Sequence, residues 1–463
     1  PPGSDRAMRS GLIVGVLAAI VVTGCPLPAL GTPDSGVALV MADPALAPPP
    51  TVGPTSSSSP TSSSSPTATA PLAHVLVPLV PVTGFWSTQR SITRQDLAAA
   101  LSGAGTSPRR VLVSVDDLVA LAAELGVRPG PNVRALPPAE VLAQLATTPT
   151  ALGILRAEDV TPRVRALEVD GVALFGGNRV KDLGAWPLLV AEPPGSRPTS
   201  FDPDAVWTLM AGGDVMLDRT VYKRAIGEGR GVDDPWNGGL ARITARVCCG
   251  WPGMRIIRAE RIGPAGAVRT LIRRADIAVV NLEGPAPDDP VHRLFGLVFT
   301  MDPRLLAGVQ RAGIDAVSLA NNHIHNGGRS GVLQTIRNLG RVGIGHFGAG
   351  GDLAAARRPA WFTVAGTRLA ILGYNGIGRA ANASSARAGA APLSISIMRA
   401  EIRAARRAGA DVVAVLPHWG AEYTDRITVQ QRTFGREALA AGADLVLGNH
   451  SHWAGPIGLR SGN

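Results

Sequence analysis

Five apolar segments between residues 205 and 463 each run directly into a short loop that carries Asp, Glu, Asn or His. These loops hold Asp214, Glu283, His323, His418 and His450. Segments predicted to be helical lie between them, among others at 303–312, 397–407 and 428–441. This alternation predicts an α/β fold for residues 205–463. Because ligands bind at the carboxyl ends of strands in open α/β sheets, it also predicts one site at that edge.

The side chains in these loops are of the types that bind transition metals. Five of the eight histidines of the chain lie here, at His323, His325, His418, His450 and His452. Imidazole, carboxylate and amide oxygen together suit Zn, Mn or Fe, and the absence of cysteine from the pattern excludes a zinc-ribbon type of site. Each loop alone has a structural interpretation, such as a turn at Asp214 or a packed histidine at His418. Their recurrence at five strand ends favours a metal site.

Residues 72–200 are predicted to form a separate, smaller α/β domain. Strand-like apolar segments occur at 74–82, 111–115, 151–155 and 169–175, and helix-like segments begin after Asp116 and at Pro137. This pattern resembles one lobe of a periplasmic solute-binding protein. It offers no residue that we assign to a site.

The first 25 residues are predicted to be an export signal. Met8 and Arg9 precede a short apolar run that ends in Val-Thr-Gly-Cys at residues 22–25. That tetrapeptide is similar to the bacterial lipobox, so Cys25 is the predicted lipidation site. A signal cleaved elsewhere and an uncleaved anchor remain alternatives. Residues 26–71 are rich in Ser, Thr and Pro, which cannot bury a core, and are predicted to be a linker. The protein is therefore expected to be exported and membrane-anchored at the cell surface.

The net charge of +10 does not indicate binding to nucleic acid. Arginine carries almost all of the positive charge, with lysine only at Lys181 and Lys223, and the arginines are scattered along the chain. A nucleic-acid surface would need clustered basic residues with interleaved aromatic ones. No apolar stretch reaches the ~20 residues of a spanning helix, which excludes a multi-pass membrane protein.

Together the loop motifs resemble the CapA family of poly-gamma-glutamate capsule synthesis proteins, which belongs to the calcineurin-like metallophosphoesterase superfamily. The matching segments are 213–216, 281–283, 319–323, 418–423 and 448–452, and the resemblance extends over about residues 206–457. It implies a layered α/β sandwich of the metallophosphoesterase type. Five motifs in order are specific for the family, but they are not specific for the reaction.

The resemblance also implies roles for individual residues. Asp214 matches a ligand of one metal, and Glu283 stands where metallophosphoesterases place the carboxylate that bridges two metals. Asn322 resembles the amide ligand of the Asn-His motif, and His323 resembles its catalytic partner, which touches the leaving group. The later histidine ligands are matched by His418, His450 and His452.

Two positions depart from the pattern. Metallophosphoesterases usually carry a histidine two residues after the first Asp, where this chain has Met216, as the CapA family does. The CapA family usually carries an Asp three residues after the Asn-Asn-His motif, where this chain has Asn326. Loss of that charge is expected to weaken a second metal. Only eleven residues follow His452, so the chain is also predicted to be truncated at its C-terminus.

Two hypotheses about function result, and the sequence leaves open whether the protein is an enzyme. The first is a cell-envelope protein of capsule or poly-gamma-glutamate synthesis or export, with a di-metal hydrolase-type site. Such a site would use one or two Mn, Zn or Fe ions on an anionic polymer or a phosphoester. The second is a non-catalytic module on the same fold that binds polymer, metal or a capsule synthase membrane complex. Met216 and Asn326 motivate the second hypothesis.

Overall fold

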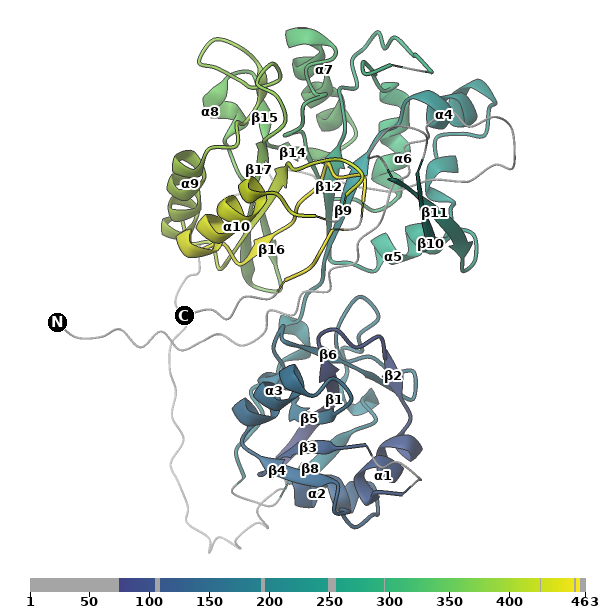
Figure 1. The fold of residues 1–463 in the computed structure, drawn as a ribbon, viewed down its shortest axis with the longest axis vertical. Helices are drawn as coiled ribbons and strands as arrows, with labels where there is room; N and C mark the ends of the chain where they lie inside the picture. The colour runs from purple at the N-terminus through teal and green to yellow at the C-terminus, as the bar shows by residue number, and fades with distance from the viewer. Residues whose placement is uncertain are drawn as a thin grey trace, which may run out of the picture. The chain divides into compact units, whose positions relative to one another are not determined.

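The computed structural model describes residues 75–104, 109–192, 196–248, 255–294, 296–424, 426–453 and 455–458. The predicted export signal, Cys25 and the predicted linker lie outside the described residues. The described chain divides into two compact units, coloured purple to blue and teal to yellow in Figure 1. The first contains residues 75–174 and 180–203, and the second contains 175–179 and the described residues from 204 onward.

The first unit is built on a six-stranded sheet. The order is β4-β3-β5-β1-β6, and β8 pairs with the other end of the long strand β1. The strands are β1 Val75–Gly84, β3 Val111–Ser114, β4 Val133–Leu136, β5 Leu152–Arg156, β6 Val164–Ala166 and β8 Leu189–Glu192, with a small separate pair of β2 Ser91–Ile92 and β7 Glu168–Val169. The helices are α1 Arg94–Ser102, α2 Leu118–Glu124 and α3 Pro138–Thr147. Helix α1 begins where the Thr93 side chain accepts a hydrogen bond from the Asp96 amide.

A buried ion cluster closes one end of this sheet. Arg156, at the end of β5, donates from Nε to Asp117 Oδ1 at 2.6 Å, and its Nη2 lies 3.9 Å from Glu192 Oε2. Burial raises the pKa of both the Asp117 and the Glu192 carboxyl groups. The cluster joins β5, β8 and the turn before α2, so it is part of the interior of this unit.

The second unit contains two four-stranded sheets. The first, in the order β14-β13-β12-β9, is entirely parallel; the second has the order β16-β17-β19-β20, and only β16 is antiparallel to its neighbour. The strands are β9 Leu209–Val215, β12 Ile277–Leu282, β13 Ala316–Ser318, β14 Gly345–Phe347, β16 Ala360–Val364, β17 Thr367–Asn375, β19 Val412–His418 and β20 Leu445–Val446. Strands β9, β12, β13, β19 and β20 follow the five apolar segments predicted from the sequence, and the predicted α/β fold class is confirmed.

Alternating side chains of the second sheet enter two different cores. Leu369 and Ile371 of β17 belong to the cluster that also contains Val279 and Val317 of the first sheet. Their neighbours in the chain, such as Leu372, pack instead with buried residues of α9 and α10. Because successive strand residues point to opposite faces, this alternation places one core between the two sheets and a second core under the helices. The unit is therefore a layered α/β sandwich.

Helices cover the outer faces of the sandwich (Figure 1). They are α4 Arg219–Tyr222, α5 Ala267–Arg273, α6 Leu306–Arg311, α7 Gly328–Arg341, α8 Leu353–Ala356, α9 Ile395–Arg407 and α10 Val429–Ala441. Helix α10 begins with a capping box, in which Thr428 and Gln431 bond each other's backbone amides. The segment 303–312, predicted as one helix, is a 3₁₀ turn at Pro303–Leu305 followed by α6.

Two further strand pairings complete the described part of the second unit. Strands β10 Leu240–Cys248 and β11 Arg255–Ile262 form an antiparallel hairpin that the sequence analysis did not predict, and β15 Ala349–Gly350 pairs with β18 Gly389–Ala390. A π-helical turn at Lys223–Gly227 continues α4. Among the helices of the described residues, none combines the length and the apolar character that a membrane span requires.

Candidate metal centre

The carboxyl ends of strands from both sheets bring the predicted ligands together. Asp214 lies in β9, Glu283 directly follows β12, and His418 ends β19. An irregularity in β9 sets the register, because Ala211 pairs with Val279 whereas Asp214 pairs with Asn281. Gly212 occupies the irregular stretch, and a Cβ atom there would lie 2.6 Å from Val280 Cγ1. A glycine is therefore needed to place Asp214 level with the end of β12.

Two buried carboxylates share one amide donor at this edge. Asn281 Nδ2 donates to Asp214 Oδ1 at 2.8 Å and to Glu283 Oε2. Burial raises the pKa of Glu283 well above its ordinary value, and the neighbouring negative charge of Asp214 raises it further. Two buried like charges whose donors are only neutral amides are unfavourable, so the pair is suited to a bound cation.

His418 is fully buried and is oriented by amide side chains at both ring nitrogens. Its Nδ1 lies 2.6 Å from Asn449 Oδ1 and 3.3 Å from Asn281 Nδ2. Its Nε2 lies 2.8 Å from Asn322 Oδ1 and 3.4 Å from Glu283 Oε1. Nε2 and two oxygen atoms thus converge on one place. Burial lowers the pKa of His418 to about 3, so the ring is neutral and able to bind metal.

The loop after β20 supplies two more histidines on strained backbone. His450 and His452 have φ angles of 89° and 49°, in the left-handed region that non-glycine residues rarely adopt. The loop is held by Asp214, whose Oδ2 accepts from the His450 backbone amide at 2.9 Å. Both Nδ1 atoms are buried, and neither has a hydrogen-bond partner among the described residues. Burial lowers the pKa of His450 to about 3.

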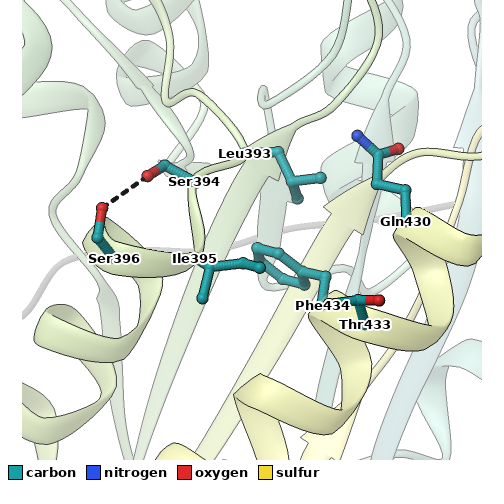
Figure 2. A pocket seen from close by; sticks show the side chains of 7 residues that line it. All are labelled: Leu393, Ser394, Ile395, Ser396, Gln430, Thr433 and Phe434. Atoms are coloured by element: carbon teal, nitrogen blue, oxygen red, sulfur yellow. Dashed lines mark hydrogen bonds between the residues drawn. The ribbon is translucent and has the colours of Figure 1, made fainter.

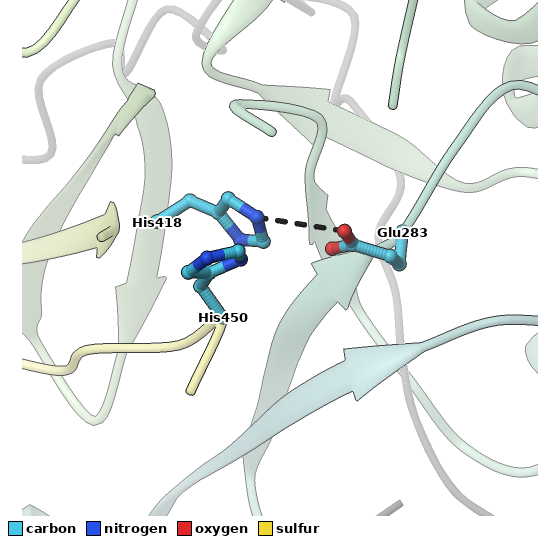
Figure 3. Close-up of side chains that lie close together, drawn as sticks. All are labelled: Glu283, His418 and His450. Carbon is cyan, nitrogen blue, oxygen red and sulfur yellow. Dashed lines mark ion pairs between the residues drawn. The ribbon is translucent and has the colours of Figure 1, made fainter. Parts of the chain in front are cut away.

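Metal-type side chains form two groups that share His450. The first contains Glu283, His418 and His450, all buried, and Figure 3 shows the His418 ring facing the Glu283 carboxylate with His450 beside it. The second contains Glu422, His450 and His452, and Glu422 is exposed. In each group the donor atoms lie within 4.8 Å of one another. Their imidazole and carboxylate donors fit Zn, Mn or Fe, and the two partnerless Nδ1 atoms in the second group agree with an ion there.

Asp214 borders both groups without belonging to either. Its Oδ1 lies 3.7 Å from His418 Nδ1, and its Oδ2 lies 4.0 Å from His452 Nε2. Its remaining bonds hold Asn281 and the loop of His450. Asp214 therefore orients the residues around it, and it also lies within reach of an ion near His452.

His323 lies at the edge of the centre. Its Nε2 is 3.8 Å from Glu283 Oε1, and its ring packs at 4.2 Å between centroids against Phe299. Its Nδ1 is 3.3 Å from the side-chain amide of Asn326, where a carboxylate was expected from the resemblance. Burial lowers the pKa of His323, and the neutral Asn326 opposes this less than a carboxylate would.

Met216 takes no part in the two groups. The side chain is buried, and its sulfur accepts a long bond from the Asp218 backbone amide at 3.4 Å. His325, included among the candidate histidines, likewise lies outside both groups, and its Nε2 is buried without a hydrogen-bond partner in the described chain.

Sequence reasoning missed four polar residues of the site. Glu422 was quoted within a motif but was given no role, and Asn281, Asn321 and Asn449 were passed over as neighbours of the ligands. Asn321 Nδ2 donates to Asn281 Oδ1 at 2.9 Å and to the Leu282 carbonyl at 2.8 Å. The position of an Asn directly beside a predicted ligand was the available signal, because such amides orient ligands.

A cavity of about 530 Å³ lies elsewhere, between the beginnings of α9 and α10. Figure 2 shows Leu393, Ile395 and Phe434 lining it together with small polar side chains. Two of these, Ser394 and Ser396, bond each other at 3.0 Å. The lining contains no ionisable side chain, so the cavity is not the place where the metal-type donors converge.

Comparison with known proteins adds a family to this geometry. The family model described as bacterial capsule synthesis protein PGA_cap matches residues 208–463. The chain is 29% identical over 148 residues to the capsule biosynthesis protein CapA of Bacillus anthracis, which covers 31% of this chain and 36% of that protein. It is 28% identical over 291 residues to a "Probable polyglutamine synthesis accessory protein" of Mycobacterium tuberculosis, covering 56% of this chain and 72% of that protein.

The chain therefore matches little more than a third of the length of the Bacillus anthracis protein. Among solved structures, the NAD nucleotidase of Haemophilus influenzae aligns with a TM-score of 0.28 and 17% identity, over 46% of this chain and 36% of that one. A TM-score of this size supports no argument about the site.

Proposed function

Because this chain belongs to the bacterial capsule synthesis protein PGA_cap family, we propose that its second unit is a metal-dependent hydrolase of the cell envelope. The proposed substrate is an anionic polymer such as γ-linked polyglutamate, or a phosphoester. The observation that carries the proposal is the buried group of Glu283, His418 and His450, in which a carboxylate and two neutral imidazoles face one another.

The chemistry of the proposal divides between the metal and the chain. Divalent ions would be held by Glu283, His418, His450, Asn322 and Asp214, with His452 and Glu422 at the second group. When bound, such ions would lower the pKa of a bound water and stabilise negative charge. Asn449 and Asn281 keep His418 and Glu283 in position through hydrogen bonds of their side-chain amides. His323 lies at the edge of the centre, where it could hold a proton for the leaving group.

Location and partners form part of the same proposal. We propose export, anchoring through lipid on Cys25, and association with a capsule synthase complex in the membrane. The support is the lipobox-like tetrapeptide, followed by the Ser-, Thr- and Pro-rich segment, and the names of the relatives in capsule synthesis. A diacylglyceryl group buries many methylenes at about 0.8 kcal/mol each, enough for stable anchoring.

Metal analysis and hydrolysis assays on the full chain test the proposed activity. Purified protein is expected to hold about one to two equivalents of Mn, Zn or Fe. It should then hydrolyse bis(4-nitrophenyl) phosphate or a γ-linked glutamate oligomer, lose this activity on chelation and regain it when metal is returned. A chain that binds no metal on titration contradicts the proposal. A chain that binds metal but hydrolyses neither compound supports the alternative below.

The alternative is a non-catalytic module that binds polymer or a synthase through the same site. The contact between His323 and Asn326 favours it, because a neutral amide beside a buried imidazole leaves little of the protonated form at neutral pH. A general acid that is rarely protonated would contribute little to catalysis.

Asn326→Asp is expected to activate the protein. A carboxylate at this distance from His323 Nδ1 should raise the pKa of the imidazole and increase hydrolysis by about tenfold or more. The high-pH limb of the pH–rate profile, where the acid loses its proton, should move to higher pH. Asn326→Ala removes the hydrogen bond that raises the pKa of His323 and should not move this limb upward. An unchanged profile in Asn326→Asp protein with full metal content would show that His323 does not act as the acid.

A further inference from the structure

Arg219 stands beside the site on backbone that is strained. It follows β9 by a few residues, begins the short helix α4, and has a φ angle of 55°. A non-glycine residue in the left-handed region is unfavourable and persists only where the surroundings enforce it. Neither the predicted ligands nor the proposed chemistry makes use of this residue.

The residue before it fixes that backbone. Asp218 is fully buried; its Oδ1 lies 2.7 Å from His292 Nδ1 and its Oδ2 accepts from the Thr300 amide at 3.1 Å. Both partners belong to the segment between β12 and α6. The start of α4 and that segment are therefore held together, and Phe299 is fixed next to Thr300.

Phe299 connects Arg219 to the site. The Arg219 guanidinium carbon lies 5.2 Å from the centroid of the Phe299 ring, and that ring lies 4.2 Å from the ring of His323. The guanidinium is thus within about 9.4 Å of the imidazole centroid, the sum of these two distances. A guanidinium that lies on an aromatic face keeps N–H groups at its own edge available to bind an anion.

The charge of Arg219 is not neutralised by a neighbouring carboxylate. Its Nη2 donates to the Gly296 carbonyl, and no ion pair within the described parts of the chain includes it. Its Nε is buried and has no hydrogen-bond partner there. Nearby arginines differ: Arg304 is paired with Asp302 at 2.6 Å. A strained, partly buried and uncompensated guanidinium at the edge of a site is suited to recognise an anion.

We propose that Arg219 binds an anionic group of the substrate, a carboxylate or a phosphate, that neighbours the bond broken at the metal centre. The inference rests on the proposed function and specifies its substrate as a chain or ester with at least two anionic groups. One group would lie among the metal-type donors and the next would reach the guanidinium past His323 and Phe299. Arg219 would act in specificity, and the proton and metal chemistry would belong to the other residues.

Binding of small anions to metal-loaded full-length protein tests the inference without using catalysis. Isothermal titration would compare inorganic phosphate, which has one anionic centre, with propane-1,3-diol bisphosphate and with a γ-linked glutamate dimer. Arg219→Gln is expected to weaken at least one of the two larger probes about tenfold or more, and phosphate less than about threefold. Arg219→Lys should restore part of the loss. Whether the bisphosphate or the glutamate dimer is the more affected distinguishes phosphate from carboxylate as the neighbouring group.

Arg304→Gln is the matched control, because it removes the same charge from a nearby arginine whose charge Asp302 already balances. It should leave all three affinities unchanged. Equal weakening of all probes by Arg219→Gln, no weakening of any, or the same loss in Arg304→Gln would overturn the inference, as would a wild-type chain that binds none of the probes. Selective binding in a protein without hydrolytic activity would uphold it while rejecting the hydrolase.

Discussion

Glu283→Ala protein is expected to lose most of its bound metal and to hydrolyse substrate at least ~10³-fold more slowly than the wild type. Glu283 supplies the carboxylate of the buried group, with Oε1 3.4 Å from His418 Nε2. Without it, the buried group would contain no carboxylate and would keep only the neutral imidazoles of His418 and His450. Elemental analysis and initial rates on the same preparation measure both effects.

Two further variants separate this effect from misfolding. Glu283→Gln keeps the shape of the side chain, and because burial and Asp214 raise the pKa of Glu283, removing its charge relieves a cost of the metal-free fold. Metal-free Glu283→Gln protein is expected to unfold at the same temperature as the wild type or a higher one. Glu437→Ala, which changes a half-buried carboxylate 3.3 Å from Arg399 Nη1, should retain metal and rate. Full activity in folded Glu283→Gln protein would contradict the assigned role.

Metal affinity is expected to rise with pH by about tenfold per pH unit until the raised pKa of Glu283 is passed. Below that pKa the carboxyl group of the metal-free protein holds a proton, which an incoming ion must displace. His418 and His450 have pKa values of about 3 and are already neutral above pH ~5, so they add no such dependence. Titration calorimetry in buffers of different ionisation enthalpy measures the released proton directly.

Glu283→Gln provides the test of this assignment, since it has no proton to release. Its weaker metal binding should be nearly independent of pH between 5 and 7. A slope that persists in the variant would transfer the proton to another group and would show that the histidines titrate near their ordinary values.

The sequence was sufficient for the strands that carry the ligands. Val412 to His418 is a continuous apolar run because this strand is buried on both faces, and such runs are visible without a structure. The hairpin of β10 and β11 escaped prediction for the opposite reason. Its strands interleave arginines with apolar residues, and only pairing with each other distinguishes them from a loop.

The ligands could be predicted at and shortly after the strand ends, whereas the contact of Glu422 with the site could not. Glu422 lies four residues beyond β19, and it reaches His450 because the loop folds back, with the Tyr423 amide donating to the Ser451 carbonyl at 2.8 Å. No spacing in the sequence indicates that return. The orienting bonds of Asn281 and Asn449 depend likewise on tertiary register, which in β9 is set by an irregularity at Gly212.

The donors of the buried group come from both layers of the sandwich: Glu283 from the first sheet, His418 and the loop of His450 from the second. Any ion held by all three would cross-link the two sheets. The free energy of unfolding would then depend on the concentration of free metal. An ion at a thousand times its dissociation constant adds about 4.1 kcal/mol to it. Such a chain would keep its fold in metal-rich surroundings and become vulnerable to proteolysis when metal is scarce.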